Sequence, residues 1–202
     1  MKGILSVNGK LWKTLDKYVE TDKIIEENCA FGGACMLKTY VRLLDIDFAK
    51  LMDLYAEGNR ENARYHYPND DAYVGVLKVE QDFYQYLREV FFRVEGAVYA
   101  VWVEKGMYIS ALRLEPYGDG LLLEALETHP KYRRKGYAKK LIEAVLLGLK
   151  DKGITAVYSH INKRNVASLQ THITCGFQRI SERATYIDGS VTHASCTMAF
   201  RF

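Results

Sequence analysis

Hydrophobic residues follow two different spacings along the chain, and the change between them falls near residue 97. Before it, apolar positions recur every three to four residues, which is typical of amphipathic helices; after it, they alternate with polar ones, which is typical of strands. The first spacing predicts helices over 47–62 and 79–92, with a polar loop over 59–75 between them. An apolar run at 36–44 precedes these helices and predicts the first strand.

The alternating segments predict a series of short strands separated by glycine-containing turns. They lie at 98–103, 107–112, 121–128, 154–161, 177–186 and 191–202. Two further helices interrupt this series. Together the elements predict an α/β protein of the α+β type, whose mixed but mostly antiparallel central sheet is flanked by helices.

The two later helices each carry an apolar stripe. The first ends near Gly153 and has apolar positions at Ala138, Leu141, Ile142, Val145 and Leu149. The second begins at Asn165, a favourable N-cap, and ends at Gly176. Its expected buried residues are Val166, Leu169 and Ile173. The opposite face would then carry Asn165, Ser168 and His172.

Composition is that of one globular domain: 202 residues, 49% hydrophobic and 26% charged. A net charge of +3 is too small to argue for a nucleic-acid partner. No apolar segment has the length of a membrane span, and the run after Met1 is too short for a signal peptide. The four cysteines lack C-x-x-C or zinc spacing, so we expect reduced thiols, a cytoplasmic location and no metal cofactor.

Residues 1–35 differ from the rest of the chain. The segment 11–27 is charged and could form a helix, whereas 28–35 is small and glycine-containing. We therefore expect an N-terminal extension over 1–35, upstream of a natural start at Met36, and one domain over 36–202. The alternative is a genuine N-terminal helix that packs on this domain.

The segment 129–140 joins the predicted strand at 121–128 to the next helix, and six of its last ten residues are basic. The start of a helix exposes unpaired backbone N–H groups and the positive end of the helix dipole, so it favours an anion such as phosphate. Neither the P-loop pattern nor the Rossmann G-x-G-x-x-G occurs in the chain. The segment therefore predicts a phosphate site of another kind.

The spacing R-x-x-G-x-A at Arg133, Gly136 and Ala138, three residues after Pro130, resembles the acetyl-CoA signature Q/R-x-x-G-x-G/A of the GNAT acetyltransferase superfamily. A second block, Asn165 to Ser168 followed by Gly176-Phe177, resembles that family's N-x-x-A/S…G-F element. The resemblance covers about the whole of 36–202 and implies a GNAT fold, in which two splayed strands form the acetyl-CoA cleft. A basic helix start in an unrelated α/β domain is the alternative.

The resemblance implies a set of residues that contact the cofactor. Backbone N–H groups from Arg134 to Lys139 would bind the pyrophosphate, Arg133 would brace the loop, and the strand end would offer backbone groups to the pantetheine amides. The expected contacts are Leu126, Glu127, Thr128, Arg133, Arg134, Lys135, Gly136, Tyr137, Ala138, Lys139, Asn165 and Ser168. Gly136 has no Cβ and would allow close approach of the phosphates.

Acetyl transfer to an amine needs a neutral amine and a proton for the departing thiolate. Glu124 stands where many members of the family carry a glutamate that faces the acceptor, and it could remove the amine's proton; an exposed strand carboxylate is the alternative. Glu127 has the opposite strand parity, so the two carboxylates would not act together unless a bulge intervenes. His172 stands where the family often has a tyrosine acid. Tyr137, Tyr158 and His160 are alternative proton donors.

The resemblance therefore implies an acetyl-CoA-dependent N-acetyltransferase that is a monomer or homodimer and acts on a small-molecule or peptide-like amine. The aromatic residues Tyr65, His66, Tyr67, Tyr73 and Tyr84 could line the acceptor site or serve as packing. Alternatives from other classes are an acyl-CoA sensor or a protein-interaction module without turnover. A nucleic-acid binder is disfavoured because no recognised module is present.

Overall fold

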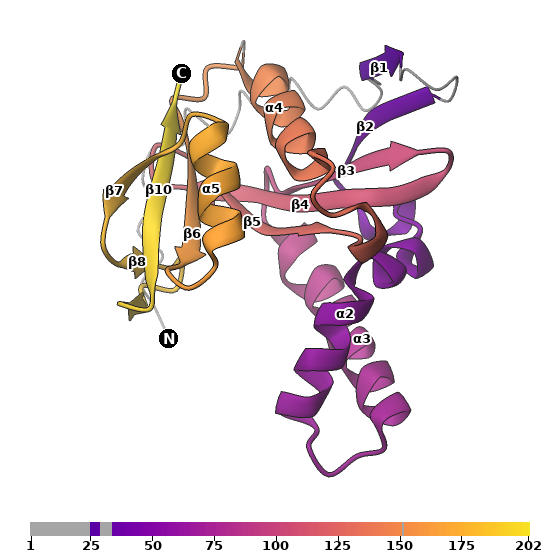
Figure 1. The fold of residues 1–202 in the computed structure, drawn as a ribbon. Coiled ribbons are helices and arrows are strands. Elements are labelled where there is room, and N and C mark those ends of the chain that lie inside the picture. Colours follow the sequence, from indigo (N-terminus) through magenta and orange to yellow (C-terminus); the bar gives the residue numbers. More distant parts are fainter. Residues whose placement is uncertain (1–24, 29–33, 151) are drawn as a thin grey trace.

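The computed structural model describes residues 25–28, 34–150 and 152–202. In this part of the chain the main sheet has eight strands, in the order β1-β2-β3-β4-β5-β6-β10-β7 (Figure 1). They are β1 (Ile25–Asn28), β2 (Ala34–Tyr40), β3 (Val98–Glu104), β4 (Met107–Tyr117), β5 (Gly120–Thr128), β6 (Ala156–Asn162), β7 (Gln178–Ser181) and β10 (Ser195–Arg201). Only β5 and β6 pair in parallel. The predicted mixed, mostly antiparallel sheet is confirmed.

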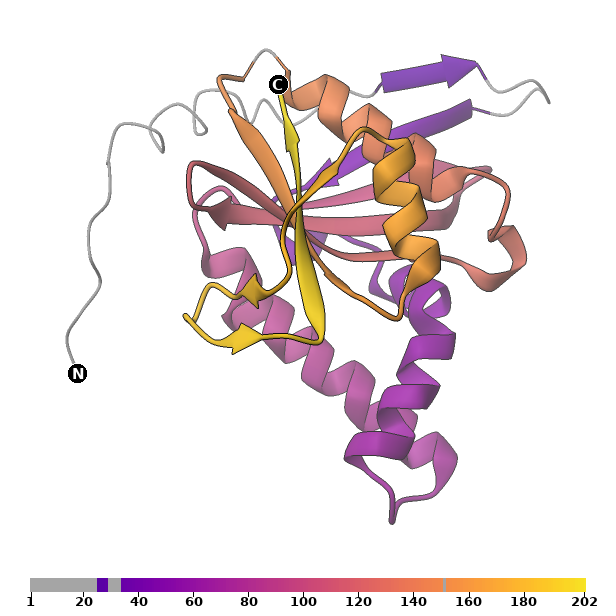
Figure 2. The same cartoon turned by 60° about the vertical axis from the view of Figure 1, so that its left-hand side comes forward.

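Helices cover both faces of this sheet (Figures 1 and 2). The α-helices are α2 (Phe48–His66), α3 (Ala72–Glu89), α4 (Tyr137–Leu149) and α5 (Val166–Thr174), and the short 3-10 helices are η1 (Leu43–Asp45), η2 (Phe91–Arg93) and η3 (Pro130–Tyr132). The small hairpin of β8 (Ala184–Thr185) and β9 (Val191–Thr192) completes the fold. No helix in the described ranges has the length and apolar character needed to cross a membrane.

Alternation along the strands divides the core into two clusters. On β3, Ala100 and Trp102 pack with the buried residues of α4, whereas Tyr99 and Val101 pack with those of α2 and α3. This is the period of two that predicted the strands. The apolar stripe predicted for α4 is buried as expected, apart from Ala138, which is half-buried.

The α2–α3 hairpin corrects the predicted polar loop over 59–75. Most of that segment is helical, and the connection spans only residues 67–71. Asp71 caps α3 by accepting a hydrogen bond from the backbone N–H of Tyr73 at 2.9 Å, which is a start signal within the predicted loop. The hairpin projects beyond the sheet (Figure 1), so its outer turns meet solvent on most sides and lack the apolar stripe of a packed helix.

The buried face predicted for α5 is wrong at two of its three residues; the third, Leu169, is partly buried and packs against the α4 cluster. Val166 is 71% exposed and Ile173 is 53% exposed, while His172 is 1% exposed. The His172 ring packs edge-on against Phe177 at 5.0 Å between centroids, and its Nδ1 donates to the carbonyl oxygen of Ser168 at 2.8 Å. A local hydrogen bond and an aromatic contact therefore bury a residue that polarity alone places at the surface.

Part of the expected N-terminal extension is a strand. Ile25–Asn28 pairs antiparallel with β2, so the helix predicted over 11–27 is wrong at its last three residues; its other residues lie outside the described ranges. The strand β2 begins at Ala34, ahead of Met36, and ends at Tyr40 rather than residue 44. A natural start at Met36 stays a prediction.

Candidate functional site

The strands β5 and β6 pair only over a short stretch and then separate. Their register joins Leu121, Leu122 and Leu123 to Val157, Tyr158 and Ser159. Beyond it, β6 continues beside β10, while the second half of β5 pairs with β4 alone. The backbone groups of Glu124–Thr128 on the β6 side are therefore not used by the sheet. Three of these residues, Leu126, Glu127 and Thr128, were expected to offer backbone groups to a pantetheine chain.

A bulge in β5 begins where the two strands separate. Glu124 pairs with Arg113 and Glu127 with Ala111, so two residues of β5 oppose Leu112 alone, and Ala125 has φ +50°. The hydroxyl of Tyr55 on α2 donates to the carbonyl oxygen of Ala125 at 2.9 Å and accepts from Tyr99 at 2.8 Å. The helix α2 thus holds the bulge in place.

The bulge changes the parity of β5. Its extra residue brings Glu124 and Glu127 to the same face, beneath α2 and α3, while Leu126 packs into the α4 cluster. Strict alternation would have placed the two carboxylates on opposite faces. The bulge that the sequence analysis required for Glu124 and Glu127 to lie on one face is therefore present.

Arg133 lies at the centre of the loop that follows β5. Its Nε donates to the carbonyl oxygen of Thr128 at 3.1 Å, and its Nη2 donates to Glu127 at the same distance. Its Nη1 forms an ion pair with Glu57 of α2. Arg133 therefore ties the loop to the end of β5 and to α2, rather than pointing freely into solvent.

Backbone N–H groups at the start of α4 are unpaired. Within the described part of the chain, the N–H groups of Arg134, Lys135, Gly136, Ala138 and Lys139 have no hydrogen-bond partner, and the first helical bond is from Lys140 to the carbonyl of Gly136. Arg134 and Gly136 have φ of +60° and +83°, so the chain turns sharply here. No side chain caps this helix start. Consecutive free N–H groups at the positive end of a helix are suited to bind a phosphate oxygen.

Basic side chains surround these N–H groups. Arg134, Lys135 and Lys139 are exposed; Lys135 lies over the Tyr132 ring at 5.2 Å, and Lys139 pairs with Glu143 at 3.6 Å. Tyr137 points away from the loop, because its hydroxyl donates to Glu104 on β3. The loop is therefore positively charged and open to an anion.

Asn165 and Ser168 lie at the start of α5. The Asn165 side chain accepts a hydrogen bond from the backbone N–H of Ser168 at 3.0 Å, so Asn165 acts as the N-cap of the helix. Asn165 itself is exposed. The N-cap role accounts for its presence here without a ligand.

His172 is not brought together with Glu124. It packs against Phe177 on the α4–α5 side of the sheet, whereas Glu124 faces α2 and α3. Its Nδ1 carries a proton, because the carbonyl of Ser168 can only accept, and burial lowers the pKa of the ring. Its Nε2 is buried with no partner in the described residues. A neutral ring whose N–H is already bonded is poorly suited to protonate a thiolate.

The alternative proton donors are also occupied. Tyr137 donates to Glu104, and that hydrogen bond is the main cause that raises the pKa of Tyr137 to about 12. Tyr158 donates to Asp119. The Nε2 of His160 donates to the carbonyl of Thr185 at 3.0 Å, and burial lowers the pKa of His160. Each side chain therefore has a structural partner.

A carboxylate cluster, made of Arg113, Glu115 and Glu124, lies on the sheet face beneath α3. Arg113 Nη2 is 3.6 Å from Glu124, and its guanidinium stacks over the ring of Tyr86 at 4.9 Å. Glu115 is only 8% exposed, and burial, followed by the nearby Glu124, raises its pKa to about 7. The sequence analysis missed Arg113 and Glu115 because it ended the strand at residue 112. Their alternation with Leu112 and Leu114 was the available signal.

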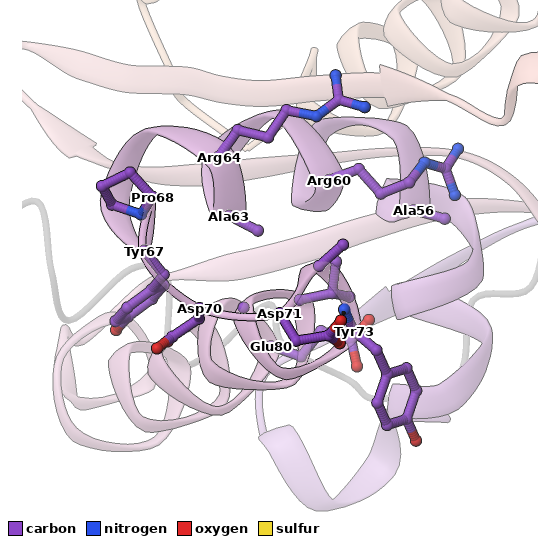
Figure 3. A pocket seen from close by; sticks show the side chains of 13 residues that line it. Ala56, Arg60, Ala63, Arg64, Tyr67, Pro68, Asp70, Asp71, Tyr73 and Glu80 are labelled. Carbon is purple, nitrogen blue, oxygen red and sulfur yellow. Dashed lines mark hydrogen bonds between the residues drawn. The ribbon is translucent and has the colours of Figure 1, made fainter.

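A separate pocket lies between α2 and α3 (Figure 3). It has a volume of about 480 Å³, and its charged lining residues include Arg60 and Arg64 from α2, Asp71 at the N-cap of α3 and Glu80 from α3. The expected aromatic residues divide: Tyr67 and Tyr73 line this pocket, Tyr65 stacks on His66 in solvent, and Tyr84 packs on Phe48. No residue of β4, β5 or the basic loop lines this pocket, so it is distinct from the carboxylate cluster.

A sheet that separates beside a basic helix start is the arrangement of acetyltransferases of the GNAT type. The chain belongs to the acetyltransferase (GNAT) family, because residues 50–177, more than half of its length, match the model of that family.

One curated relative and two solved structures show how far the similarity extends. The [ribosomal protein bS18]-alanine N-acetyltransferase of Haemophilus ducreyi is 30% identical over 79 residues, which is 38% of this chain and 54% of that enzyme. The chain thus matches about half the length of this relative. An acetyltransferase from Streptococcus agalactiae superposes with a TM-score of 0.59 at 18% identity, covering 83% of this chain and 98% of that one. The PaiA N-acetyltransferase of Thermoplasma acidophilum, in complex with coenzyme A, gives 0.57 at 13% identity over 82% and 99%. These structures are similar in fold.

Proposed function

We propose that the protein transfers the acetyl group of acetyl-CoA directly to the primary amine of a small molecule or a peptide-like acceptor. The observation that carries this proposal is the run of unpaired N–H groups at residues 134–139, beside the part of β5 that no longer pairs with β6. Such a pair of features suits one elongated ligand with an anionic end and an amide-containing arm. Membership of the GNAT family supports the same cofactor.

The loop and the strand would hold the cofactor together. The N–H groups of Arg134–Lys139 would donate to the pyrophosphate, with Lys135 and Arg134 adding positive charge, while Leu126, Glu127 and Thr128 would bond the pantetheine arm through their backbones. Tyr137 and Ala138 would contribute their backbone N–H groups, and Ala138 has a small side chain. Asn165 and Ser168 would border the arm from α5. Arg133 would fix the loop through Thr128 and Glu57.

Glu124 is the proposed base. It lies at the bulge, on the face beneath α2 and α3, and it directly precedes the segment that would bind the arm. Its carboxylate would take a proton from the acceptor ammonium, directly or through one water. The neutral nitrogen would then attack the acetyl carbonyl carbon, and the nitrogen of the adduct would release its second proton to solvent. The carbon–sulfur bond would break, and the thiolate would take a proton from solvent. His172 is not needed in this scheme.

The acceptor is proposed at the level of a class. The Haemophilus ducreyi relative acts on an alanine of a ribosomal protein, which supports a peptide amine as one acceptor type. The carboxylates beneath α3 favour a cationic acceptor, whether a small molecule or a peptide. We propose a cytoplasmic location, where acetyl-CoA is available.

The test is a thiol-release assay over a panel of amines and N-terminal peptides, together with calorimetric titration of acetyl-CoA. We expect cofactor binding and release of one thiol per acetylated product on at least one acceptor class. The alternative of a non-catalytic acyl-CoA sensor is favoured by one observation, the buried His172 in place of a free acid. Cofactor binding with no turnover of any amine in the panel would support the sensor. Absence of cofactor binding would overturn both the acetyltransferase and the sensor.

A further inference from the structure

Arg113, Glu115 and Glu124 form one group across two strands. Arg113 and Glu115 are two residues apart on β4, so both side chains leave the sheet on the α2–α3 face, and Glu124 is the register partner of Arg113 on β5. Glu115 and Glu124 are diagonal neighbours across β4 and β5, and the nearby Glu124 contributes, after burial, to the raised pKa of Glu115. The two carboxyls therefore meet in a place where one of them is almost fully buried.

The charges in this group do not balance when both carboxyls are ionised. One guanidinium then faces two carboxylates, and the side chain of Arg113 is only 13% exposed because Phe83, Tyr86 and Phe91 cover it. Two like charges held this closely in a buried site cannot both ionise at their ordinary pKa values. The group is neutral overall when it keeps one proton.

Neighbouring groups provide no second cation. From α2 and β3, Tyr55 and Tyr99 bond to each other and to the bulge, and from α3, Tyr86 lies over Arg113. From β6, His160 is close enough to feel the charge of Glu124, and its Nε2–H is bonded to Thr185. The retained proton therefore has to lie between Glu115 and Glu124.

We propose that Glu115 is a positioning residue for Glu124: the Glu115 carboxyl keeps its proton, and its O–H donates to the Glu124 carboxylate and holds it toward the acceptor. This inference rests on the proposed role of Glu124 as the base. In this arrangement Arg113, whose Nη2 lies 3.6 Å from Glu124, neutralises the remaining charge.

The protonation state of Glu115 would set how Glu124 is held. Below neutral pH, Glu115 keeps its proton and donates to the Glu124 carboxylate. As the pH rises through about 7, Glu115 ionises, so this donor is lost and a second negative charge faces Glu124. The step near pH 7 therefore belongs to Glu115, and removing Glu115 should remove it.

The first measurement does not require an acceptor. In the full-length protein labelled with ¹³C at the glutamate side-chain carboxyls, Glu115 should titrate near pH 7. In Glu115→Gln this step should disappear, and in Glu182→Gln, a matched change at an exposed carboxylate that pairs with Lys163, it should remain. A Glu115 titration near the ordinary glutamate value would overturn the inference.

The second measurement is the pH dependence of kcat/KM on one identified acceptor. Glu115→Gln keeps an amide that can donate to Glu124, so its turnover at pH 7 should stay within about threefold of the wild type while the step near pH 7 is lost. Glu115→Ala removes the donor and should lower kcat about tenfold or more, with KM for acetyl-CoA unchanged. An unchanged pH profile in Glu115→Gln would contradict the inference. If no acceptor is found, the proposed function fails, while the carboxyl titration still decides whether Glu115 keeps its proton.

Discussion

The loop at residues 129–136 presents backbone N–H groups to its expected ligand, whereas the sheet face beneath α2 and α3 presents the side chains of Arg113, Glu115 and Glu124. The first arrangement needs only a glycine at φ +83° and a helix start, which lie together in the sequence. The second needs two strands in a particular register and a bulge. A short sequence motif therefore predicts the site that binds its ligand through the backbone. The site made of side chains depends on strand register, so it can be recognised only in the folded structure.

The largest expected effect tests the side-chain face. Glu124→Gln keeps the shape of the side chain and removes its basicity, so it should lower kcat about a hundredfold or more. Acetyl-CoA affinity, measured by calorimetry, should stay close to that of the wild type, because the loop donates through its backbone. Full activity in this variant, with Glu182→Gln as the matched control, would show that the base lies elsewhere.

The next effect tests the backbone loop with a matched pair at Gly136. Both Asp and Asn tolerate φ above zero better than other side chains, so Gly136→Asp and Gly136→Asn share the conformational strain and differ in charge. The carboxylate would face the pyrophosphate, and we expect it to weaken acetyl-CoA binding about tenfold or more relative to the Asn variant. Equal affinities of the two variants in calorimetry would remove the phosphate site from this loop.

A smaller effect tests the link between the two regions. Tyr55→Phe removes the hydroxyl that bonds Ala125 and Tyr99, and a lost hydrogen bond of this kind costs about 1 kcal/mol. For a domain of this size the melting temperature should fall by about 2–4 °C. Turnover should fall several-fold because the bulge that carries Glu124 loosens. Tyr84→Phe, at a ring that packs edge-on against Phe48, is the control and should change neither quantity.

The smallest effect concerns His172. Burial lowers its pKa in the folded state below the ordinary value of 6.5, so the unfolded chain binds a proton at a higher pH than the folded chain. Stability from this group is present above pH 6.5 and is lost as the pH falls toward the folded pKa. The melting temperature of His172→Leu minus that of the wild type should therefore be larger at pH 5 than at pH 8. The turnover of this variant should stay near that of the wild type. A folded variant without activity would support His172 as the acid.

The fold was largely predictable because its elements carry their own signals. Alternation gave the strands from 98 onward, and the stripe of Leu141, Ile142, Val145 and Leu149 gave α4. The α2–α3 connection was misplaced because the outer turns of a projecting hairpin need no apolar face. On α5, a histidine that bonds the carbonyl of Ser168 is buried, whereas Val166 and Ile173, which were expected to be buried, are exposed.

The candidate site divides in the same way. Gly136 and Arg133 were identified from the motif, since loop and helix start are contiguous in the sequence. Arg113 and Glu115 were not, because their meaning depends on which β5 residue lies opposite them. Parity along β5 would have separated Glu124 from Glu127, and only the folded chain shows the extra residue at Ala125 that brings them together.

The uncapped start of α4 has a consequence for how folding and binding are linked. Gly136 offers no side chain to its own helix, and the first N–H groups have no partner among the described residues, so in the isolated protein only solvent can bond them. An anion that binds there completes the helix, and the free energy it releases counts toward folding as well as affinity. The bound cofactor would then contribute to the stability of the folded state. The apoprotein would be less stable than the cofactor-bound protein in a cell.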